Sequence, residues 1–190
     1  MRLFPGFLIL STLLTGCASL TEDECAVGEW ARIGANDAAQ GLKASRLTDH
    51  KKACERYNIE PDQTTYMEGY RRGLVAYCTP TNGFNVGRNG YTYRTICPRD
   101  TETDFLSGYK RGTTLHNIET SIAQVRDSLR EVRTQIGELR AAPSKENRDA
   151  RMRLYSEENR LENEEARLGR QRDAALVNAD IFLQNINPDI

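Results

Sequence analysis

YMEGYRRG at residues 66–73 recurs as FLSGYKRG at residues 105–112, with both glycines, the tyrosine and the basic pair kept in register. Within each copy the aromatic residues and glycines are three or four positions apart, so they share one face of a helix. Each glycine costs a helix about 1 kcal/mol relative to alanine, which indicates that another helix approaches at backbone distance. We therefore predict helix-packing roles for Gly69, Tyr70, Gly73, Gly108, Tyr109 and Gly112.

A third segment, WARIGANDAAQGL at residues 30–42, has a similar face of small residues, with Gly34 and Gly41 two helical turns apart. We expect the two copies to pack on each other or to share this helix as a partner. A glycine-lined ligand groove is the alternative, but this face lacks the convergent polar groups that such a groove needs. Asp37 on the same helix is a candidate binding residue, since a carboxylate on a small-residue face requires a partner such as Arg71, Arg72 or Arg111.

The N-terminal stretch MRLFPGFLILSTLLTGC has one early arginine and an apolar run too short to span a bilayer, as is typical of a secretory signal peptide. Its end resembles a bacterial lipobox, which implies cleavage after residue 16 and acylation of Cys17 by palmitate and related chains. The alternative is an ordinary signal peptide cut near Ala18. Ala18 and Ser19 replace the aspartate that retains lipoproteins in the inner membrane, so we predict an outer-membrane location facing the periplasm.

Four further cysteines, Cys25, Cys54, Cys78 and Cys97, lie in a chain that is predicted to be exported into an oxidising compartment, which favours two disulfides. Four cysteines allow three pairings. A 78–97 bridge would close a glycine-rich segment with little apolar content and contribute about 3 kcal/mol, leaving Cys25 for Cys54. A zinc site is the alternative, but the spacings of 29, 24 and 19 residues contain no Cys-x-x-Cys pair, so no metal site is predicted.

The C-terminal half has a regular apolar stripe. Its members are separated by alternating intervals of three and four residues: Leu115, Ile118, Ile122, Val125, Leu129, Val132, Ile136 and Leu139. This heptad pattern predicts a long helix, and Pro143 then forces a turn. A second helix follows, with one apolar seam at Leu154, Leu161, Leu168, Ala175 and Phe182 and one largely charged seam at Glu158, Glu165, Arg172 and Ala179. The short connection predicts an antiparallel helical (coiled-coil) hairpin.

Three parts are therefore expected: a signal peptide at 1–16, a compact disulfide-stapled helical domain at 17–101 that continues to about 114, and the hairpin at 115–187 with its turn near 141–144. The segment NGFNVGRNGYTY within the compact domain, with Asn-Gly twice, predicts a minor β hairpin. Its alternating Tyr91 and Tyr93 are candidate ligand-binding residues. The predicted fold class is mainly α.

Catalytic signals are weak. No phosphate loop, nucleophile elbow or His-Glu-x-x-His motif is present, and the two histidines, His50 and His116, fall in different predicted elements. His116 matches Tyr77 in the repeat, which favours a structural role. We therefore predict no catalytic residues, no cofactor and no enzymatic activity. With 26 basic and 27 acidic side chains, the chain also lacks the positive surplus that nucleic-acid binding requires.

A family resemblance is carried by the following residues and motifs, in order: Cys25, Trp30, Gly34, Asp37, Gly41, His50, Cys54, YMEGYRRGLVAYC and GRNGYTYRTIC. In this combination the chain resembles bacterial lipoproteins that contain domain of unknown function 2799, over roughly residues 22–112. The resemblance implies an envelope location and a fold, but no activity.

The expected function is that of a non-enzymatic scaffold or partner-binding protein, anchored in the outer membrane by its lipid. The alternative is a ligand-binding module, for glycan or peptidoglycan, that uses the Tyr- and Gly-rich surface near Tyr91 and Tyr93.

Overall fold

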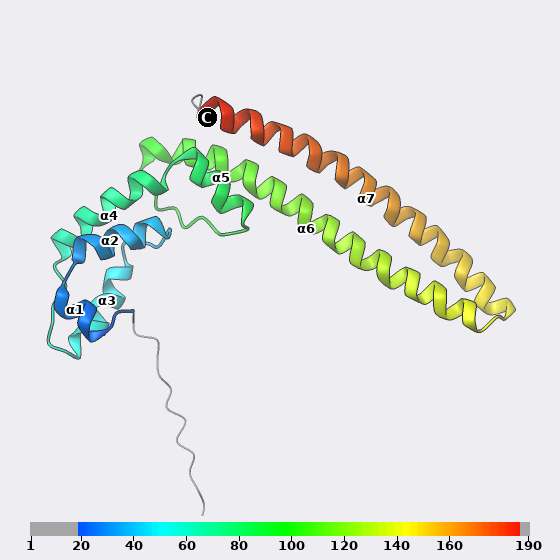
Figure 1. Ribbon diagram of the computed structural model, residues 1–190, viewed down its shortest axis with the longest axis horizontal. Helices are drawn as coiled ribbons and strands as arrows, with labels where there is room; N and C mark the ends of the chain where they lie inside the picture. The colour runs from blue at the N-terminus through cyan, green and yellow to red at the C-terminus, as the bar shows by residue number, and fades with distance from the viewer. Residues whose placement is uncertain (1–18, 187–190) are drawn as a thin grey trace, which may run out of the picture.

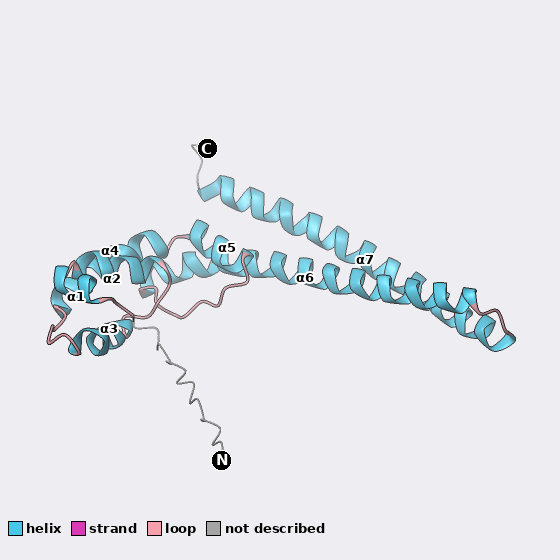
Figure 2. Ribbon diagram, turned by 60° about the horizontal axis from the view of Figure 1, so that its bottom comes forward, coloured by secondary structure: helices cyan, strands magenta, loops and turns pink. Residues whose placement is uncertain are grey.

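The computed structural model describes residues 19–186, which form seven helices and no strand (Figures 1 and 2). The mainly helical class is thus confirmed, whereas the predicted β hairpin is wrong. The predicted signal peptide and the lipidation site Cys17 lie outside the described residues. Among the helices of residues 19–186, none combines the length and the apolar character needed to cross a membrane.

The first four helices are α1 (Glu22–Val27), α2 (Trp30–Ala39), α3 (Arg46–Glu55) and α4 (Gln63–Tyr77). Local side chains cap the starts of α1 and α4. Thr21 and Glu24 form a reciprocal capping box at the start of α1, and Asp62 accepts a hydrogen bond from the Thr65 amide at the start of α4. Gly28 ends α1 with a positive φ of 66°, a conformation that glycine adopts at little cost.

Helix α5 (Pro80–Arg88) occupies most of the segment that was predicted as a β hairpin. Thr79 caps it by accepting the Asn82 amide, and Pro80 fills the first helical position, where its missing N–H is not needed. Gly83 and Gly87 are one helical turn apart and face another helix, so they do not act as turn residues. An extended segment then leads to α6.

Helices α6 (Arg99–Ala141) and α7 (Lys145–Ile186) have 43 and 42 residues and form the long antiparallel hairpin. In Figure 1 their connection lies at the end far from α2 and α4, while the C-terminal end of α7 returns toward α5. The turn is closed by Ser144, whose Oγ accepts a hydrogen bond from the Asn147 amide. The hairpin has its own apolar cluster, built from Leu129, Val132, Ile136 and Leu161.

The rest of the fold consists of two equivalent units. In the first unit α2 packs along α4, and in the second α5 packs along the first turns of α6. Each unit has one disulfide: Cys25–Cys54 in the first and Cys78–Cys97 in the second. In both, one cysteine precedes the first helix and the other lies in the connection to the second helix. The two predicted disulfides are thereby confirmed.

Candidate functional site

The glycines of the first unit lie where two backbones touch. A methyl group added to Gly69 would lie 1.8 Å from the Ala31 carbonyl oxygen, and one added to Gly34 would lie 2.1 Å from the Tyr66 carbonyl oxygen. Gly73 is similarly close to the backbone of Ala35. The contacts advance in the same direction along both helices, so α2 and α4 run parallel at backbone contact.

The second unit repeats this arrangement. A methyl group on Gly108 would lie 1.9 Å from the Pro80 carbonyl oxygen, and one on Gly83 would lie 2.1 Å from that of Phe105. A methyl group on Gly112 would lie 2.1 Å from the carbonyl oxygen of Phe84. Each copy of the repeated motif therefore has its own partner helix, α2 or α5, whereas sequence reasoning expected the copies to pair or to share α2.

The two partner helices carry a signal that sequence reasoning missed. Gly34 and Gly41 are seven residues apart, and so are Gly83 and Gly90. In unit one, the first glycine of the repeated motif, Gly69, comes 35 residues after Gly34. In unit two, Gly108 comes 25 residues after Gly83, because only the first connection contains the ten-residue α3. This unequal spacing conceals the duplication from any search for a single period.

The tyrosines of the repeated motif perform the same task in both units. Tyr70 Oη donates to the carbonyl oxygen of Leu42 at 2.7 Å, and Tyr109 Oη donates to that of Tyr91 at 3.1 Å. Each bond fixes the chain just after the first helix of its unit. Burial raises the pKa of Tyr70 to about 12.

Asp37 lies in a buried hydrogen-bond network that exists only in the first unit. Its Oδ2 accepts from Tyr66 Oη at 2.7 Å and lies 2.8 Å from His50 Nε2, and His50 Nδ1 lies 3.0 Å from Ser19 Oγ. The expected arginine partner is therefore replaced by a histidine and a tyrosine. Burial and the bond to Asp37 raise the pKa of Tyr66, which keeps its hydroxyl a donor.

Val86 and Phe105 occupy the corresponding positions of the second unit, where an aromatic cluster replaces the polar network. The Phe105 ring packs against the rings of Tyr77 and Tyr93 at centroid distances of 5.2 and 4.6 Å. Because the equivalent site is apolar in the second unit, the packing itself does not require the Asp37 carboxylate. The network instead connects α2, α3 and α4 to the chain at Ser19.

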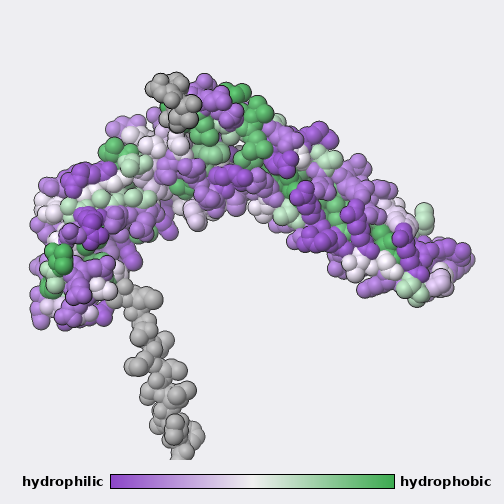
Figure 3. All heavy atoms as spheres, viewed as in Figure 1, coloured by the Kyte–Doolittle hydropathy of each residue, from purple (hydrophilic) through white to green (hydrophobic). Residues whose placement is uncertain are grey.

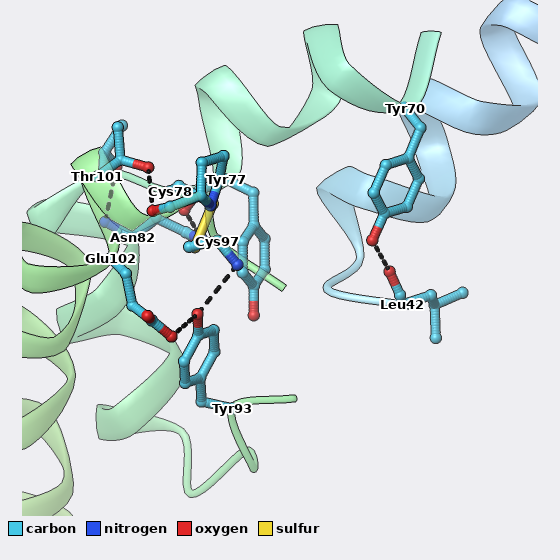
Figure 4. The surroundings of a disulfide bond; sticks show 11 residues. Leu42, Tyr70, Tyr77, Cys78, Asn82, Tyr93, Cys97, Thr101 and Glu102 are labelled. Atoms are coloured by element: carbon cyan, nitrogen blue, oxygen red, sulfur yellow. Dashed lines mark hydrogen bonds between the residues drawn. A yellow bond between two sulfur atoms is a disulfide. The ribbon is translucent and has the colours of Figure 1, made fainter. Parts of the chain in front are cut away.

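Tyr93 and Tyr91 have different surroundings. Tyr93 Oη donates to Glu102 at 2.9 Å and accepts the amide of Cys97 at 3.0 Å, beside the second disulfide (Figure 4). Its ring is packed on Phe105, whereas Tyr91 is 67% exposed. Of the two candidate binding tyrosines, Tyr91 presents its ring to solvent.

A groove lies at the boundary between the two units, with a cavity volume of about 620 Å³. We call it the inter-unit groove. One wall is the end of α2, and the other is α5 with the segment that follows it. Its polar and aromatic lining includes Gln40, Asn82, Asn85, Asn89, Tyr91 and Arg94. Tyr77 also borders it.

His116 occupies the position of Tyr77 in the second unit, where its ring lies against Gly90 and its Nδ1 is 3.3 Å from the carbonyl oxygen of Arg88. Residues 19–186 contain no group of three or more His, Cys, Asp or Glu side chains placed to hold a metal ion. His50 lies on α3 in the first unit, and His116 lies on α6 in the second.

Residues 29–114 match the family described as a protein of unknown function, DUF2799, which confirms the part of the resemblance that concerns this domain. The match begins one residue before α2 and ends at Thr114, so it covers the helix pairs of both units and excludes most of the hairpin. Neither the curated proteins nor the solved structures contain a match to the chain.

Proposed function

We propose that this protein, whose residues 29–114 match the DUF2799 family, is a lipid-anchored, periplasm-facing component of the outer membrane. In this proposal it holds a partner protein and catalyses no reaction. The lipobox-like end of the signal peptide supports the anchor at Cys17, and the hairpin of α6 and α7 supports the partner-binding role.

The observation that carries the partner-binding role is the outer surface of α7 near its C-terminal end. Val177 and Ile181 are 60% and 53% exposed there, and Leu176 is also exposed. Figure 3 shows apolar residues gathered at this end of the hairpin. The inner side is already occupied, because Phe182 packs under the Arg111 guanidinium of α6 at 4.2 Å. A helix that is apolar on both sides is normally covered by another surface.

The charged residues of the hairpin support a spacer with a solvated middle. Arg126 pairs with Glu165 at 2.6 Å, and Arg133 pairs with Glu158 and Glu162 at 2.7 Å each, so these pairs join α6 to α7. The arginine of each pair is more than half exposed, and such ion pairs add only about 0–1 kcal/mol each to the stability of the fold. The apolar seam therefore holds the helices together, and the charges keep the outside soluble.

The N-terminal contacts support an anchor that lies close to the first unit. Ser19 hydrogen bonds His50 and comes only two residues after Cys17. A lipid on Cys17 would hold the first unit near the membrane surface and leave the hairpin as the part that extends from the opposite end of the fold.

Replacing Cys17 by serine tests the anchor, because serine lacks the thiol that accepts the lipid. We expect Cys17→Ser protein to lose acyl labelling and to leave the membrane fraction after cell lysis. Membrane-bound, processed Cys17→Ser protein would refute the anchor.

Photocrosslinking in the full chain tests the partner-binding role. A photoreactive amino acid at Val177 or Ile181 should capture a discrete envelope protein. The matched control is Val75 on α4, which is 77% exposed and should capture none. Capture from Val75 and not from α7 would move the partner to the compact domain.

Excision of residues 118–183, bridged by a Gly and Ser linker, is the complementary experiment. The apolar core of the two units extends along α6 to Tyr109, and the hairpin cluster begins at Val125, so we expect an oxidised, folded remainder that has lost the partner. Unfolding of this remainder would show that the hairpin is needed for the fold.

A second candidate function is glycan or peptidoglycan binding. The specific observation that favours it is the inter-unit groove, whose amide side chains lie beside the exposed ring of Tyr91.

A further inference from the structure

We infer that the inter-unit groove binds an oligosaccharide that is neutral or acidic. This inference deepens the second candidate function and is independent of the role proposed for the hairpin. The groove volume of about 620 Å³ lies within the range of roughly 300–1,000 Å³ that is typical of small-ligand sites. Its position between two structural units is also a common one for such sites.

The amide side chains of the groove match the hydrogen-bonding character of a sugar. Asn82 and Asn89 each donate one N–H to a carbonyl oxygen of the chain, at 2.7 and 2.9 Å, and so each retains a free amide oxygen. The side chains of Gln40 and Asn85 make no hydrogen bond within residues 19–186. Since an amide offers both donors and an acceptor, these groups suit hydroxyl and acetamido groups, which also donate and accept.

The Tyr77 hydroxyl is the second observation that points to a ligand. Tyr77 is only 6% exposed, and its hydroxyl lies against Gly41, where an added methyl group would meet it at 2.5 Å. Within the described part of the chain this hydroxyl has no hydrogen-bond partner, and none is drawn to it in Figure 4. The Tyr77 Oη is not among the fully buried atoms of residues 19–186 that lack a partner, which are Arg46 Nε, Arg111 Nε and Thr113 Oγ1. It therefore keeps some solvent contact, and a ligand hydroxyl in the groove could replace water as its partner.

Tyr91 and Arg94 define the ligand class more closely. The carbonyl oxygen of Tyr91 accepts the Tyr109 hydroxyl, which fixes the backbone while the ring remains exposed. The electron-rich face of such a ring attracts the C–H groups of a sugar. Arg94 uses one N–H on the carbonyl oxygen of Gly41 at 3.2 Å, and its remaining N–H groups are available to a carboxylate. No acidic residue lines the groove, so a cationic ligand is disfavoured.

The duplicated fold provides a matched control. Asn36 on α2 is the equivalent of Asn85 on α5, because both lie two residues after the first glycine of their unit. Both side chains are exposed, but only Asn85 lines the groove. Alanine at either position leaves the helix packing untouched, so any difference in binding comes from the groove.

The experiment is calorimetric titration of the intact oxidised chain in detergent with three probes. These are tri-N-acetylchitotriose, muramidase-solubilised sacculus fragments, and the core oligosaccharide of lipopolysaccharide. We expect saturable binding of at least one probe, and the probe that binds most tightly identifies the source of the glycan. Tyr91→Ala, Tyr77→Phe and Asn85→Ala should each weaken binding by about three- to tenfold, the loss of one net hydrogen bond or stacking contact. Asn36→Ala should change the affinity for the same probe by less than about twofold.

Tyr77→Phe separates binding from folding, since the Tyr77 hydroxyl makes no hydrogen bond to another residue within residues 19–186. Its urea midpoint should be unchanged or raised while its affinity falls. Absence of saturable binding to all three probes would overturn the inference, as would equal effects of Asn36→Ala and Asn85→Ala. Either failure would leave the crosslinks from Val177 and Ile181 unaffected, so it would not count against the proposed role of the hairpin.

Discussion

Gly69→Ala is expected to destabilise the first unit strongly, although alanine is the better helix former. The added methyl carbon would lie 1.8 Å from the Ala31 carbonyl oxygen and 2.5 Å from its carbonyl carbon, whereas ordinary contact begins at 3.4 Å. The obstruction is backbone, so no side chain can rotate away. Relief requires α2 and α4 to separate by roughly 1.6 Å locally, as read from these distances, and overpacking of this kind costs about 1–3 kcal/mol.

Separation of the two helices also weakens the hydrogen bonds of Tyr66 to Asp37 and of Tyr70 to Leu42. With about 1–2 kcal/mol for these bonds and a gain of about 1 kcal/mol in helix propensity, we expect a net loss of about 3 kcal/mol. For a chain of this size the loss corresponds to a drop in melting temperature of about 6–12 °C.

The assay for this change is built into the chain. Trp30 is the single tryptophan, is buried, and precedes Ala31, so its fluorescence in a urea titration reports on this contact. The matched controls are Gly137→Ala in α6 and Gly169→Ala in α7, where no atom lies within 4 Å of the added methyl. These should stabilise their helices by up to about 1 kcal/mol. A Gly69→Ala midpoint equal to or above that of the parent would refute close helix packing at this site.

Two other predictions concern the tyrosines and the disulfides. Burial raises the pKa of Tyr70 to about 12 from an ordinary value of 10 and raises the pKa values of Tyr66, Tyr77 and Tyr93, so folding favours their neutral forms. The contribution of these tyrosines to stability should therefore be constant below pH 10 and fall as the pH rises toward 12, with a shallower fall in Tyr70→Phe; equal slopes by Trp30 fluorescence would contradict this. Removal of the 19-residue link by Cys78→Ser with Cys97→Ser should cost about 3 kcal/mol and expose residues 89–98 to limited proteolysis. A cleavage pattern like that of the parent would contradict this role of the second disulfide.

The hairpin and the close contacts could be predicted from the sequence because each depends on a local period. Regular intervals of three and four identify the apolar stripe of α6, and the glycines of YMEGYRRG mark a helix face that a neighbour must approach. Two disulfides followed from the number of cysteines and the expected compartment.

The partner of each glycine face could not be predicted in the same way. The pairing of α6 with α5 depends on Gly83 and Gly87. In the sequence alone these glycines resemble the residues of a β turn, so they did not indicate a helix that could be the partner of α6. The helix start at Thr79 and Pro80 was the stronger local signal. The inter-unit groove could not be predicted from the sequence either, since it combines the end of α2 with α5 and exists only after both units have assembled.

One helix, α6, belongs both to the second unit and to the hairpin, and it passes between them without a break. The rotational phase of the hairpin is therefore set by the glycine contacts at Gly108 and Gly112. In an α-helix each residue turns the chain by about 100° and advances it by about 1.5 Å. Insertion of a single residue between Glu119 and Leu129 would thus swing the far end of α6 to a different side of the molecule, while the glycine contacts and the ion pair of Arg88 with Glu119 stay in place. The direction in which the hairpin points therefore depends on the number of residues between Gly112 and the apolar seam of the hairpin.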